Sequence, residues 1–359
     1  MSKKMGIIGY GGMAFYHGEN ISTFKVGNTE EKLSSYLEVK GVYDINPDRM
    51  KMAQEKGFFA YESLEALLGD KEIDIVLVAT PNNFHCEMAC AAMNAGKNVV
   101  CEKPVAMSLE ELDLMIETSK KNNVLFTVHQ NRRWDHDYRI VRNAIEKGMI
   151  GKPYTIESRV HGKWGVMHGW RAYKVAGGGM LFDWGVHMID QILDMYPDKK
   201  VKSVFCVQNS VKTPEVDDYF KLIMCLEDNI NVLIEVGTYQ LYDLQRWYVC
   251  GDLGSITVPS WENGTVIQAK SGEMVWEPEV IQTKAGPTRT MAPRPQESME
   301  ENPLPGLELY WTDFYVNVCN AIDGKEEQIV KHHQIRRVLS VIMAGFKSAE
   351  TGEAVALES

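Results

Sequence analysis

Long hydrophobic runs are missing from this chain of 359 residues. A helix that crosses a bilayer needs about 20 consecutive apolar residues, and no segment comes near that length. The first apolar run, Met5 to Ile8, lacks the length and the cleavage site of a secretory signal. We therefore expect a cytoplasmic protein with no membrane partner, whose first apolar run is a strand.

Positive charge is also scarce. Lys and Arg total 38 against 49 Asp and Glu, and the formal net charge is -11 at pH 7. Such a chain repels the phosphates of nucleic acids and anionic lipids at long range. We expect no nucleic-acid partner, whereas a neutral small molecule is compatible with this charge.

Cysteine is sparse and shows no metal-binding pattern. The seven cysteines are odd in number, dispersed and mostly set in apolar stretches, which is typical of reduced thiols in a reducing compartment. Cys86 and Cys90 are four residues apart, but no second pair or histidine set at zinc spacing accompanies them. The sequence predicts no metal.

Short β-branched runs do alternate with helical stretches from residue 4 to about 128. This alternation is typical of βαβ units in a parallel sheet, so residues 1–128 are predicted to form a doubly wound α/β domain. The expected strands are 5–10, 39–43, 73–79, 98–101 and 124–128, and the expected helices between them are 48–56, 64–68, 84–95 and 109–122.

The pattern changes after residue 129. One helical stretch is followed by glycine-rich loops and by β runs that tight turns connect, which predicts an α+β domain at 129–359 with a large, mostly antiparallel open sheet. The segment 283–305 has no clear period and is expected to be a long loop. The expected strands are 201–211, 219–226, 232–238, 247–250 and 255–258, and the expected helices are 138–147, 307–321 and 334–351.

A glycine-rich motif, G-Y-G-G-M-A, follows the first strand directly and precedes a potential helix. It matches the dinucleotide-binding pattern of Rossmann domains: Gly9 permits the tight turn, and Gly11 lets the backbone approach a pyrophosphate. The helix that follows would present free N–H groups to the phosphates. A glycine-rich turn without a ligand is the alternative. We predict that Gly9, Gly11, Gly12 and Met13 bind a cofactor.

The nucleotide specificity depends on Asp44, at the end of the second predicted strand. Its carboxylate can accept both ribose hydroxyls of NAD and would repel the 2′-phosphate of NADP, so NAD is expected and NADP is less favoured. Residues 23–36 look like an insertion that lengthens the distance from the glycines. Asp44 could instead only begin an Asx turn ahead of Pro47, and Arg49 could bind a 2′-phosphate.

Several longer motifs resemble those of the glucose-fructose oxidoreductase and inositol dehydrogenase family, Gfo/Idh/MocA, over nearly the whole chain. Besides the glycine motif they are A-T-P-N-N-F-H at 79–85, G-K-N-V-V-C-E-K-P at 96–104, H-Q-N-R-R-W at 129–134, G-G-G-M-L-F-D-W-G-V-H-M-I-D at 177–190 and S-A-E-T-G at 348–352. The resemblance implies an NAD-dependent oxidoreductase that transfers a hydride between nicotinamide and a secondary alcohol of a sugar, glycoside or cyclitol.

Two of these motifs follow parallel strands, at the edge where open α/β sheets bind ligands. Pro81 takes the chain out of the sheet there, and the Glu-Lys-Pro motif aims Lys103 at the same crevice. A lysine at a strand end is often only solvated, but the resemblance implies that Lys103 hydrogen-bonds the reacting hydroxyl. The predicted cofactor-binding residues therefore also include Thr80, Pro81, Asn82, His85, Glu102 and Lys103.

Asp183 and His187 are four residues apart after three glycines, so both would project from one face of a helix that begins near Asp183. A solvated helix face is the alternative. Imidazole titrates near neutral pH, which suits a general base. The resemblance to inositol dehydrogenases implies that Lys103, Asp183 and His187 are catalytic, with His187 as the proton acceptor and Asp183 as its electrostatic or hydrogen-bonding partner.

Aromatic and hydrogen-bonding side chains near these motifs suit a sugar ring, although packing between domains could also explain them. The Trp- and Tyr-rich segment 164–173 favours a glycoside, because it could stack a second ring. The substrate-binding candidates are Lys103, Asn131, Arg133, Trp164, Trp170, Arg171, Tyr173, Asp183 and His187.

Four functions stay open at this point: a sugar or glycoside 3-dehydrogenase, a myo- or scyllo-inositol 2-dehydrogenase, a glycoside-modifying enzyme that retains and recycles NAD, and a non-catalytic NAD-binding sensor or regulatory subunit. The presence of Lys103, Asp183 and His187 together opposes the sensor. Because the open sheet resembles the family's dimerising surface, we expect a homo-oligomer, either a dimer or a tetramer.

Overall fold

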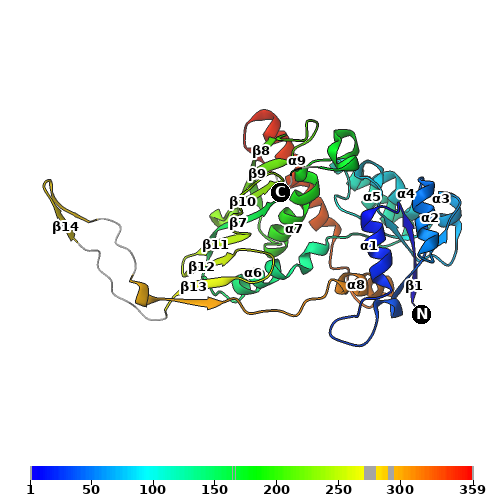
Figure 1. Ribbon diagram of the computed structural model, residues 1–359, viewed down its shortest axis with the longest axis horizontal. Helices are drawn as coiled ribbons and strands as arrows, with labels where there is room; N and C mark the ends of the chain where they lie inside the picture. Colours follow the sequence, from blue (N-terminus) through cyan, green and yellow to red (C-terminus); the bar gives the residue numbers. More distant parts are fainter. Residues whose placement is uncertain (1, 164, 166, 271–279, 290–294, 358–359) are drawn as a thin grey trace.

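The computed structural model describes residues 2–163, 165, 167–270, 280–289 and 295–357. The first lobe is a six-stranded parallel sheet in the order β3-β2-β1-β4-β5-β6, with helices between the strands (Figure 1). This confirms the predicted doubly wound domain. Its strands are β1 (Lys3–Ile8), β2 (Leu37–Tyr43), β3 (Phe59–Ala60), β4 (Ile75–Val78), β5 (Asn98–Cys101) and β6 (Phe126–Val128), and its helices are α1 (Gly12–Ile21), α2 (Pro47–Glu55), α3 (Leu64–Gly69), α4 (His85–Asn94) and α5 (Leu109–Asn122).

The second lobe is built on a nine-stranded sheet in the order β16-β13-β12-β11-β7-β10-β9-β8-β17. Only β7 and β10 pair in parallel among these neighbours, so the predicted mostly antiparallel sheet is confirmed. Its strands are β7 (Pro153–His161), β8 (Val201–Asn209), β9 (Tyr219–Leu226), β10 (Asn231–Gly237), β11 (Trp247–Gly251), β12 (Gly254–Val258), β13 (Thr265–Ala269), β16 (Met299–Pro303) and β17 (Val355–Ala356).

The helices of the second half are α6 (His136–Glu146), α7 (Val186–Met195), α8 (Thr312–Ile322) and α9 (His332–Thr351). A π-helical turn, η6 (Leu181–Gly185), leads into α7. Short 3-10 turns are η1 (Leu33–Ser35), η2 (Asn82–Phe84), η3 (Asn131–Trp134), η4 (Gly169–Ala172), η5 (Lys174–Ala176), η7 (Glu227–Asn229) and η8 (Gln296–Ser298).

The prediction of a long loop over 283–305 is wrong for much of that segment. β14 (Val280–Thr283) and β15 (Gly286–Arg289) form a separate hairpin, and β16 joins the large sheet beside β13. The sequence of β16, M-E-E-N-P, has no β-branched residue and no apolar alternation. Its strand structure comes from hydrogen bonds to β13, which a periodicity argument does not detect.

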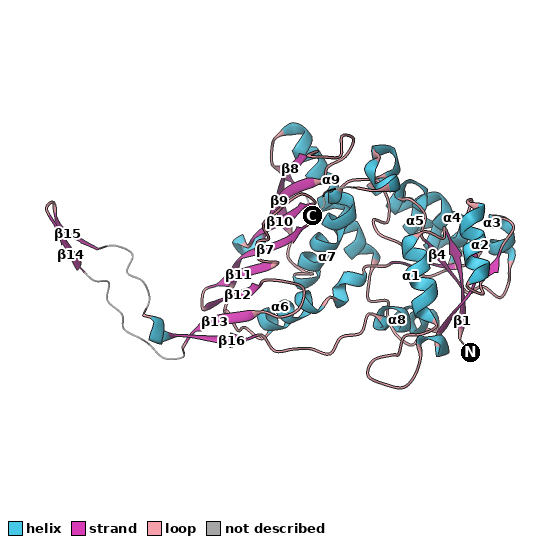
Figure 2. Cartoon of the chain, in the orientation of Figure 1, coloured by secondary structure: helices cyan, strands magenta, loops and turns pink. Residues whose placement is uncertain are grey.

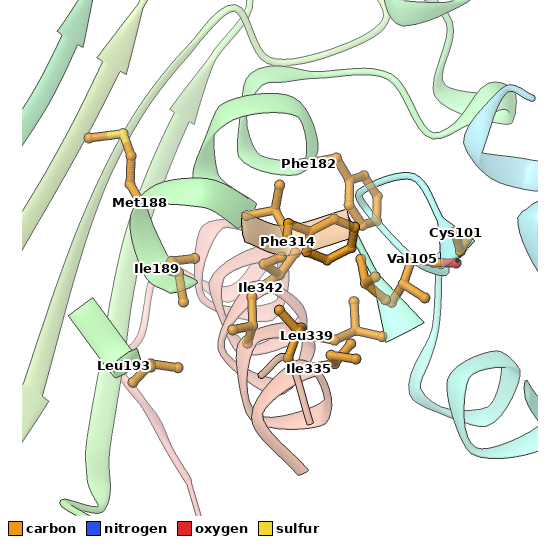
Figure 3. Packing of buried hydrophobic residues seen from close by; sticks show 14 of the residues in the cluster. Cys101, Val105, Phe182, Met188, Ile189, Leu193, Phe314, Ile335, Leu339 and Ile342 are labelled. Carbon is orange, nitrogen blue, oxygen red and sulfur yellow. Dashed lines mark hydrogen bonds between the residues drawn. The ribbon is translucent and has the colours of Figure 1, made fainter. Parts of the chain in front are cut away.

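Helices α6, α7 and α9 cover one face of the large sheet (Figure 2). Figure 3 shows how α9 contributes Ile335, Leu339 and Ile342 to a buried cluster, with Phe182 and Phe314 beside them. All five side chains are buried. This apolar layer joins α9, η6 and α8, so it supports the turn that carries Asp183.

Helix α8 returns to the first lobe, where it lies beside α1 (Figure 1). Asp323, just after α8, accepts a salt bridge from Lys3 at 2.6 Å, and Thr312 donates to the carbonyl of Lys25. Residues far apart in the sequence therefore join α8 to the first lobe. No helix in the described part of the chain has the length and apolarity needed to span a membrane.

Candidate active site

The glycine loop has the shape of a phosphate cradle. Gly9 has φ +86°, and a Cβ at this position would lie 2.9 Å from the carbonyl carbon and oxygen of Ala79, so a side chain would collide with the end of β4. Gly12 borders open space. Helix α1 begins at Gly12, and no side chain of the described residues caps it at Gly11, which leaves first-turn N–H groups for an anion.

Asp44 both forms an Asx turn and holds the glycine loop. Its carboxylate accepts from the backbone N–H of Asn46 at 2.8 Å, as the Asx alternative predicted, and from the N–H of Tyr10 at 2.6 Å. Arg49 donates to the same carboxylate at 3.2 Å. The Arg49 guanidinium also lies 3.8 Å from a Cβ built on Gly11. Asp44 and Arg49 therefore border the loop together.

The two strand-end turns are tied to each other by His85. One ring nitrogen of His85 lies 2.8 Å from the carbonyl oxygen of Pro104, and the other lies 2.9 Å from that of Thr80. Asn82 donates to the carbonyl of Gly177 at 2.7 Å. The Thr80 hydroxyl and the Asn82 amide oxygen are buried without a hydrogen-bond partner among the described residues. Such orphaned polar atoms in a crevice fit a dinucleotide that supplies the missing partners.

Lys103, Asp183 and His187 are brought to one place from the two lobes. The Lys103 ammonium donates to the Asp183 carboxylate and to the Asp183 carbonyl, both at 2.9 Å, across 80 residues of sequence. An ammonium has three donor hydrogens, so one remains for a substrate hydroxyl. Arg171 adds a longer contact to the same carboxylate, 3.4 Å from its Nε.

The charge states of these groups suit proton transfer. Burial alone would raise the pKa of Asp183, but the charges of Lys103 and Arg171 outweigh it and lower that pKa. Burial, together with the charges of Lys103 and Arg132, lowers the pKa of His187 well below its usual value. Asp183 is therefore a carboxylate and His187 a neutral imidazole at neutral pH. The His187 Nδ1 is buried and has no partner among the described residues.

The local fold before α7 explains how Asp183 is presented. Gly179 has φ +103°, and a Cβ there would lie 2.3 Å from the Asp217 carboxylate, so glycine is required. Asp217 accepts from the N–H of Leu181 at 2.8 Å. The chain then makes the π-helical turn η6, which carries Asp183. Single π-turns of this kind frequently occur at functional sites.

The remaining substrate candidates differ in their environments. Arg171 contacts Asp183, and its guanidinium stacks on Trp170 at 4.5 Å. Asn131 is half-buried at the start of η3, and Tyr173 is exposed. Trp164 lies outside the described residues.

Arg133 points away from solvent. Its guanidinium donates to both carboxylate oxygens of Asp190, at 2.7 and 2.8 Å, and to Gln334 at 3.1 Å. These contacts use all three guanidinium nitrogens, so the geometry favours a structural role. No donor nitrogen of Arg133 is thus left without a partner for a substrate.

Sequence reasoning did not assign Trp184 to the site. The Arg132 guanidinium stacks 4.2 Å from the Trp184 ring, and that ring lies 6.0 Å from the His187 ring. Trp184 also lines a cavity of about 430 Å³, together with His161, Lys163, His168, Met180 and Thr238 and adjoining backbone. The position of Trp184, next to Asp183 in the G-G-G-M-L-F-D-W-G motif, was the available signal.

A larger cavity, about 660 Å³, opens between α5 and α9 and is lined by Asp113, Lys120, His332, Arg336 and neighbouring residues. None of the predicted site residues lines it. Size alone therefore does not identify the site, and the candidate site is the group formed by Lys103, Asp183 and His187.

Both halves of the chain match known protein-family models. Residues 3–130 match the model described as "Oxidoreductase family, NAD-binding Rossmann fold", and residues 138–257 match the model of the GFO/IDH/MocA C-terminal domain. The two matches cover the glycine loop, Lys103, Asp183 and His187.

Individual relatives differ in their named substrates. The crystal structure of an NAD-binding protein from Listeria innocua is 39% identical, covers 99% of both chains and superposes with a TM-score of 0.90. The glucose-6-phosphate 3-dehydrogenase of Bacillus subtilis is 32% identical over 65% of this chain and 67% of its own length. The scyllo-inositol 2-dehydrogenase (NADP(+)) of the same organism is 29% identical over 62% and 59%.

Proposed function

The chain belongs to the GFO/IDH/MocA oxidoreductase family, and from this premise we propose that it is an NAD-dependent sugar or glycoside dehydrogenase that acts at a secondary alcohol, carbon 3 of the ring. The family comprises NAD(P)-dependent oxidoreductases acting on CH–OH groups. The observation that carries the proposal is the Lys103–Asp183 contact, with His187 on the same helical segment and the glycine loop on the adjoining sheet edge.

Each residue has a definite task in this proposal. The third hydrogen of the Lys103 ammonium binds the reacting hydroxyl, and Asp183 orients that ammonium through two hydrogen bonds. His187, which its lowered pKa keeps neutral, accepts the hydroxyl proton. NAD, when bound, supplies the hydride chemistry. The residues that would hold it are Gly9, Gly11, Gly12, Met13, Asp44, Thr80, Pro81 and Asn82.

A glycoside is favoured by the cavity beside Trp184. That ring lies near His187 and also lines about 430 Å³ of adjoining space, a size within the range of small-molecule sites. A substrate that places one ring at Lys103 could extend a second ring into this cavity. A myo- or scyllo-inositol, which has a single ring, is the alternative that the inositol 2-dehydrogenase relative supports.

We further propose a cytoplasmic location and a homo-oligomer, as the sequence indicated. The reduced cysteines support the first: all seven are free in the structure. The exposed face of the large sheet supports the second and is treated in the Discussion.

The test is an NADH absorbance assay of the purified protein with NAD and a panel of inositols, free sugars and aryl glycosides. We expect turnover on a glycoside, with losses of about 10²–10⁴-fold in Lys103→Ala and His187→Ala. Lys4→Ala and His333→Ala are the matched controls, since both lie outside the site and should keep full activity.

Each alternative has its own outcome in this assay. Turnover on an inositol alone would replace the glycoside by the cyclitol. No turnover on any compound, by a protein that still binds NAD, would overturn the dehydrogenase and favour a sensor or an enzyme that recycles its cofactor.

A further inference from the structure

Glu102, which precedes Lys103, is buried with three polar side chains from other elements. His17 lies on α1, His129 follows β6, and Tyr315 lies on α8. His17, His129 and Tyr315 are 0% exposed, and Glu102 is 5% exposed. Water therefore does not solvate these groups, so they depend on one another for hydrogen bonds, although His129 Nε2 has no partner among the described residues. We call these four residues the Glu102 cluster.

The hydrogen bonds of the Glu102 cluster run in one direction. Tyr315 Oη lies 2.6 Å from His17 Nδ1, and His17 Nε2 lies 2.7 Å from Glu102 Oε1. His129 Nδ1 lies 3.0 Å from the same Oε1. An ionised carboxylate only accepts, so both imidazoles donate to Glu102. His17 Nδ1 is then an acceptor, and the Tyr315 hydroxyl donates to it.

The pKa directions agree with this assignment. Burial, reinforced by the Glu102 charge, raises the pKa of Tyr315, so its hydroxyl keeps the proton that it donates. Burial and His129 lower the pKa of His17, which stays neutral. Burial opposes ionisation of Glu102, but the two facing imidazoles outweigh it and hold the pKa of Glu102 well below its usual range.

The same three groups could be considered as metal ligands, because His17, Glu102 and His129 offer ligand atoms within 4.8 Å of one another. Their separations of 2.7 and 3.0 Å from one carboxylate oxygen are hydrogen-bond lengths. The other nitrogen of His17 is also occupied by Tyr315. Hydrogen bonds among these side chains therefore explain the short distances without a metal ion.

The cluster reaches Lys103 through the second oxygen of Glu102. The backbone N–H of Lys103 lies 3.3 Å from Glu102 Oε2. We propose that His17, His129 and Tyr315 are positioning residues, which hold the Glu102 carboxylate and through it the Lys103 backbone, so that the ammonium meets Asp183. The inference rests on the proposed function for the role of Lys103 in turnover, but the placement of its side chain can be tested separately.

The first experiment measures placement without any turnover. Limited labelling of amines by acetic anhydride, read by mass spectrometry, gives the rate at Lys103 relative to exposed Lys25 in the same molecule. In the folded wild type, Lys103 should label slowly because Asp183 holds its ammonium. In His17→Leu and Tyr315→Phe, we expect the relative rate to rise at least about threefold, the effect of losing one buried hydrogen bond.

Two further variants separate positioning from general loosening of the core. His17→Gln keeps a donor at the place of Nε2 and should restore the wild-type labelling rate within about twofold. Tyr61→Phe removes another buried hydroxyl, which donates to Asp70 at 2.7 Å, and should leave Lys103 labelling unchanged. If Tyr315→Phe behaves like Tyr61→Phe, the proposal is wrong. Since Tyr315→Phe deletes one oxygen only, it decides the matter even if His17→Leu does not fold.

Kinetics provide the second readout. If the panel assay finds a substrate, Tyr315→Phe should lower kcat about 3- to 10-fold, with little change in KM, and should have no further effect in a Lys103→Ala background. If Tyr315→Phe lowers kcat equally in the wild-type and Lys103→Ala backgrounds, Tyr315 does not act through Lys103. Absence of turnover would count against the proposed function alone, because labelling still tests placement. A stoichiometric metal in the purified wild type would overturn the hydrogen-bonded arrangement.

Discussion

Lys103 and Asp183 form a largely buried ion pair. Their side chains are 12% and 18% exposed, so both ions lose hydration that only their mutual contact and further hydrogen bonds restore. The pair is therefore poor evidence of stability by itself. In the proposed function, the pair orients an ammonium that keeps one donor hydrogen for the substrate hydroxyl.

At the same scale, the pKa of His187 predicts the pH dependence of turnover. The base form is the neutral imidazole, which is lost as pH falls through the folded pKa. Because that pKa is well below its usual value, the acid limb of kcat/KM should lie below pH 6.5. Arg132→Gln removes one of the charges that lower it and should move the limb upward by up to roughly one unit. Arg336→Gln, a surface control, should not move it.

Asp44 and Arg49 carry the prediction for nucleotide choice. We expect tighter binding of NADH than NADPH in fluorescence titrations, because a 2′-phosphate would meet the Asp44 carboxylate. Asp44→Asn should reduce that preference about tenfold, since Arg49 then faces the 2′-position without an opposing charge. Tighter binding of NADPH by the wild type would show that attraction of the 2′-phosphate by Arg49 outweighs its repulsion by Asp44.

At the scale of elements, the turn η6 depends on a loop distant in sequence. Asp217 precedes β9, and its carboxylate accepts the N–H of Leu181 at the start of η6. Burial raises the pKa of Asp217 to about 7, although the backbone N–H of Leu181 acts against it. The turn that carries Asp183 is therefore coupled to a titrating group.

The sign of this coupling follows from linkage. A folded pKa above the unfolded value contributes stability at low pH that is lost as pH rises through about 7. Asp217→Asn keeps an acceptor oxygen and removes the titration. The wild type should lose on the order of 2 kcal/mol of unfolding free energy between pH 5 and pH 8 through this group, and Asp217→Asn should not. The difference in unfolding free energy, variant minus wild type, should therefore be larger at pH 8 than at pH 5 by that amount. Urea denaturation at both pH values tests this; a constant difference would contradict it.

For the whole molecule, the important surface is the face of the large sheet opposite α6, α7 and α9. The strand register aligns outward-facing side chains across β8, β9 and β11. Among them, Val207, Ile223 and Tyr248 are 40%, 42% and 36% exposed, and Ile267 on β13 is 37% exposed. These exposed apolar side chains support the proposed interface between subunits.

A substitution on that face should separate the subunits. We expect light scattering to give a dimer or tetramer for the wild type, and a shift to smaller species for Ile223→Glu, which buries a charge in the interface. Leu114→Glu, at an exposed position on α5, is the control and should leave the mass unchanged. A monomeric wild type at working concentration would remove the expectation of an oligomer.

Sequence patterns predicted those strands, helices and site residues whose structure depends on neighbouring residues in the chain. The parallel strands were predicted because buried strands are runs of β-branched residues, and the glycine loop because only glycine tolerates the backbone at Gly9. Two-residue β3 was too short for any pattern, and β7 and β13 were also missed. Asp183 and His187 could be named together because four residues of helix bring side chains to one face.

Local sequence determined the Rossmann lobe, the glycine loop and the polar residues at the strand ends, since each depends on neighbours within a few turns or strands. Only the tertiary structure decided that Arg133 pairs with Asp190, that β16 is a strand and that Trp184 opens onto a cavity. It also decided the contacts of Lys103 with Asp183, 80 residues away, and of Tyr315 with His17, 298 residues away. The physical reason is that a buried polar group takes its partner from whichever segment packing brings near, and periodicity does not specify that segment.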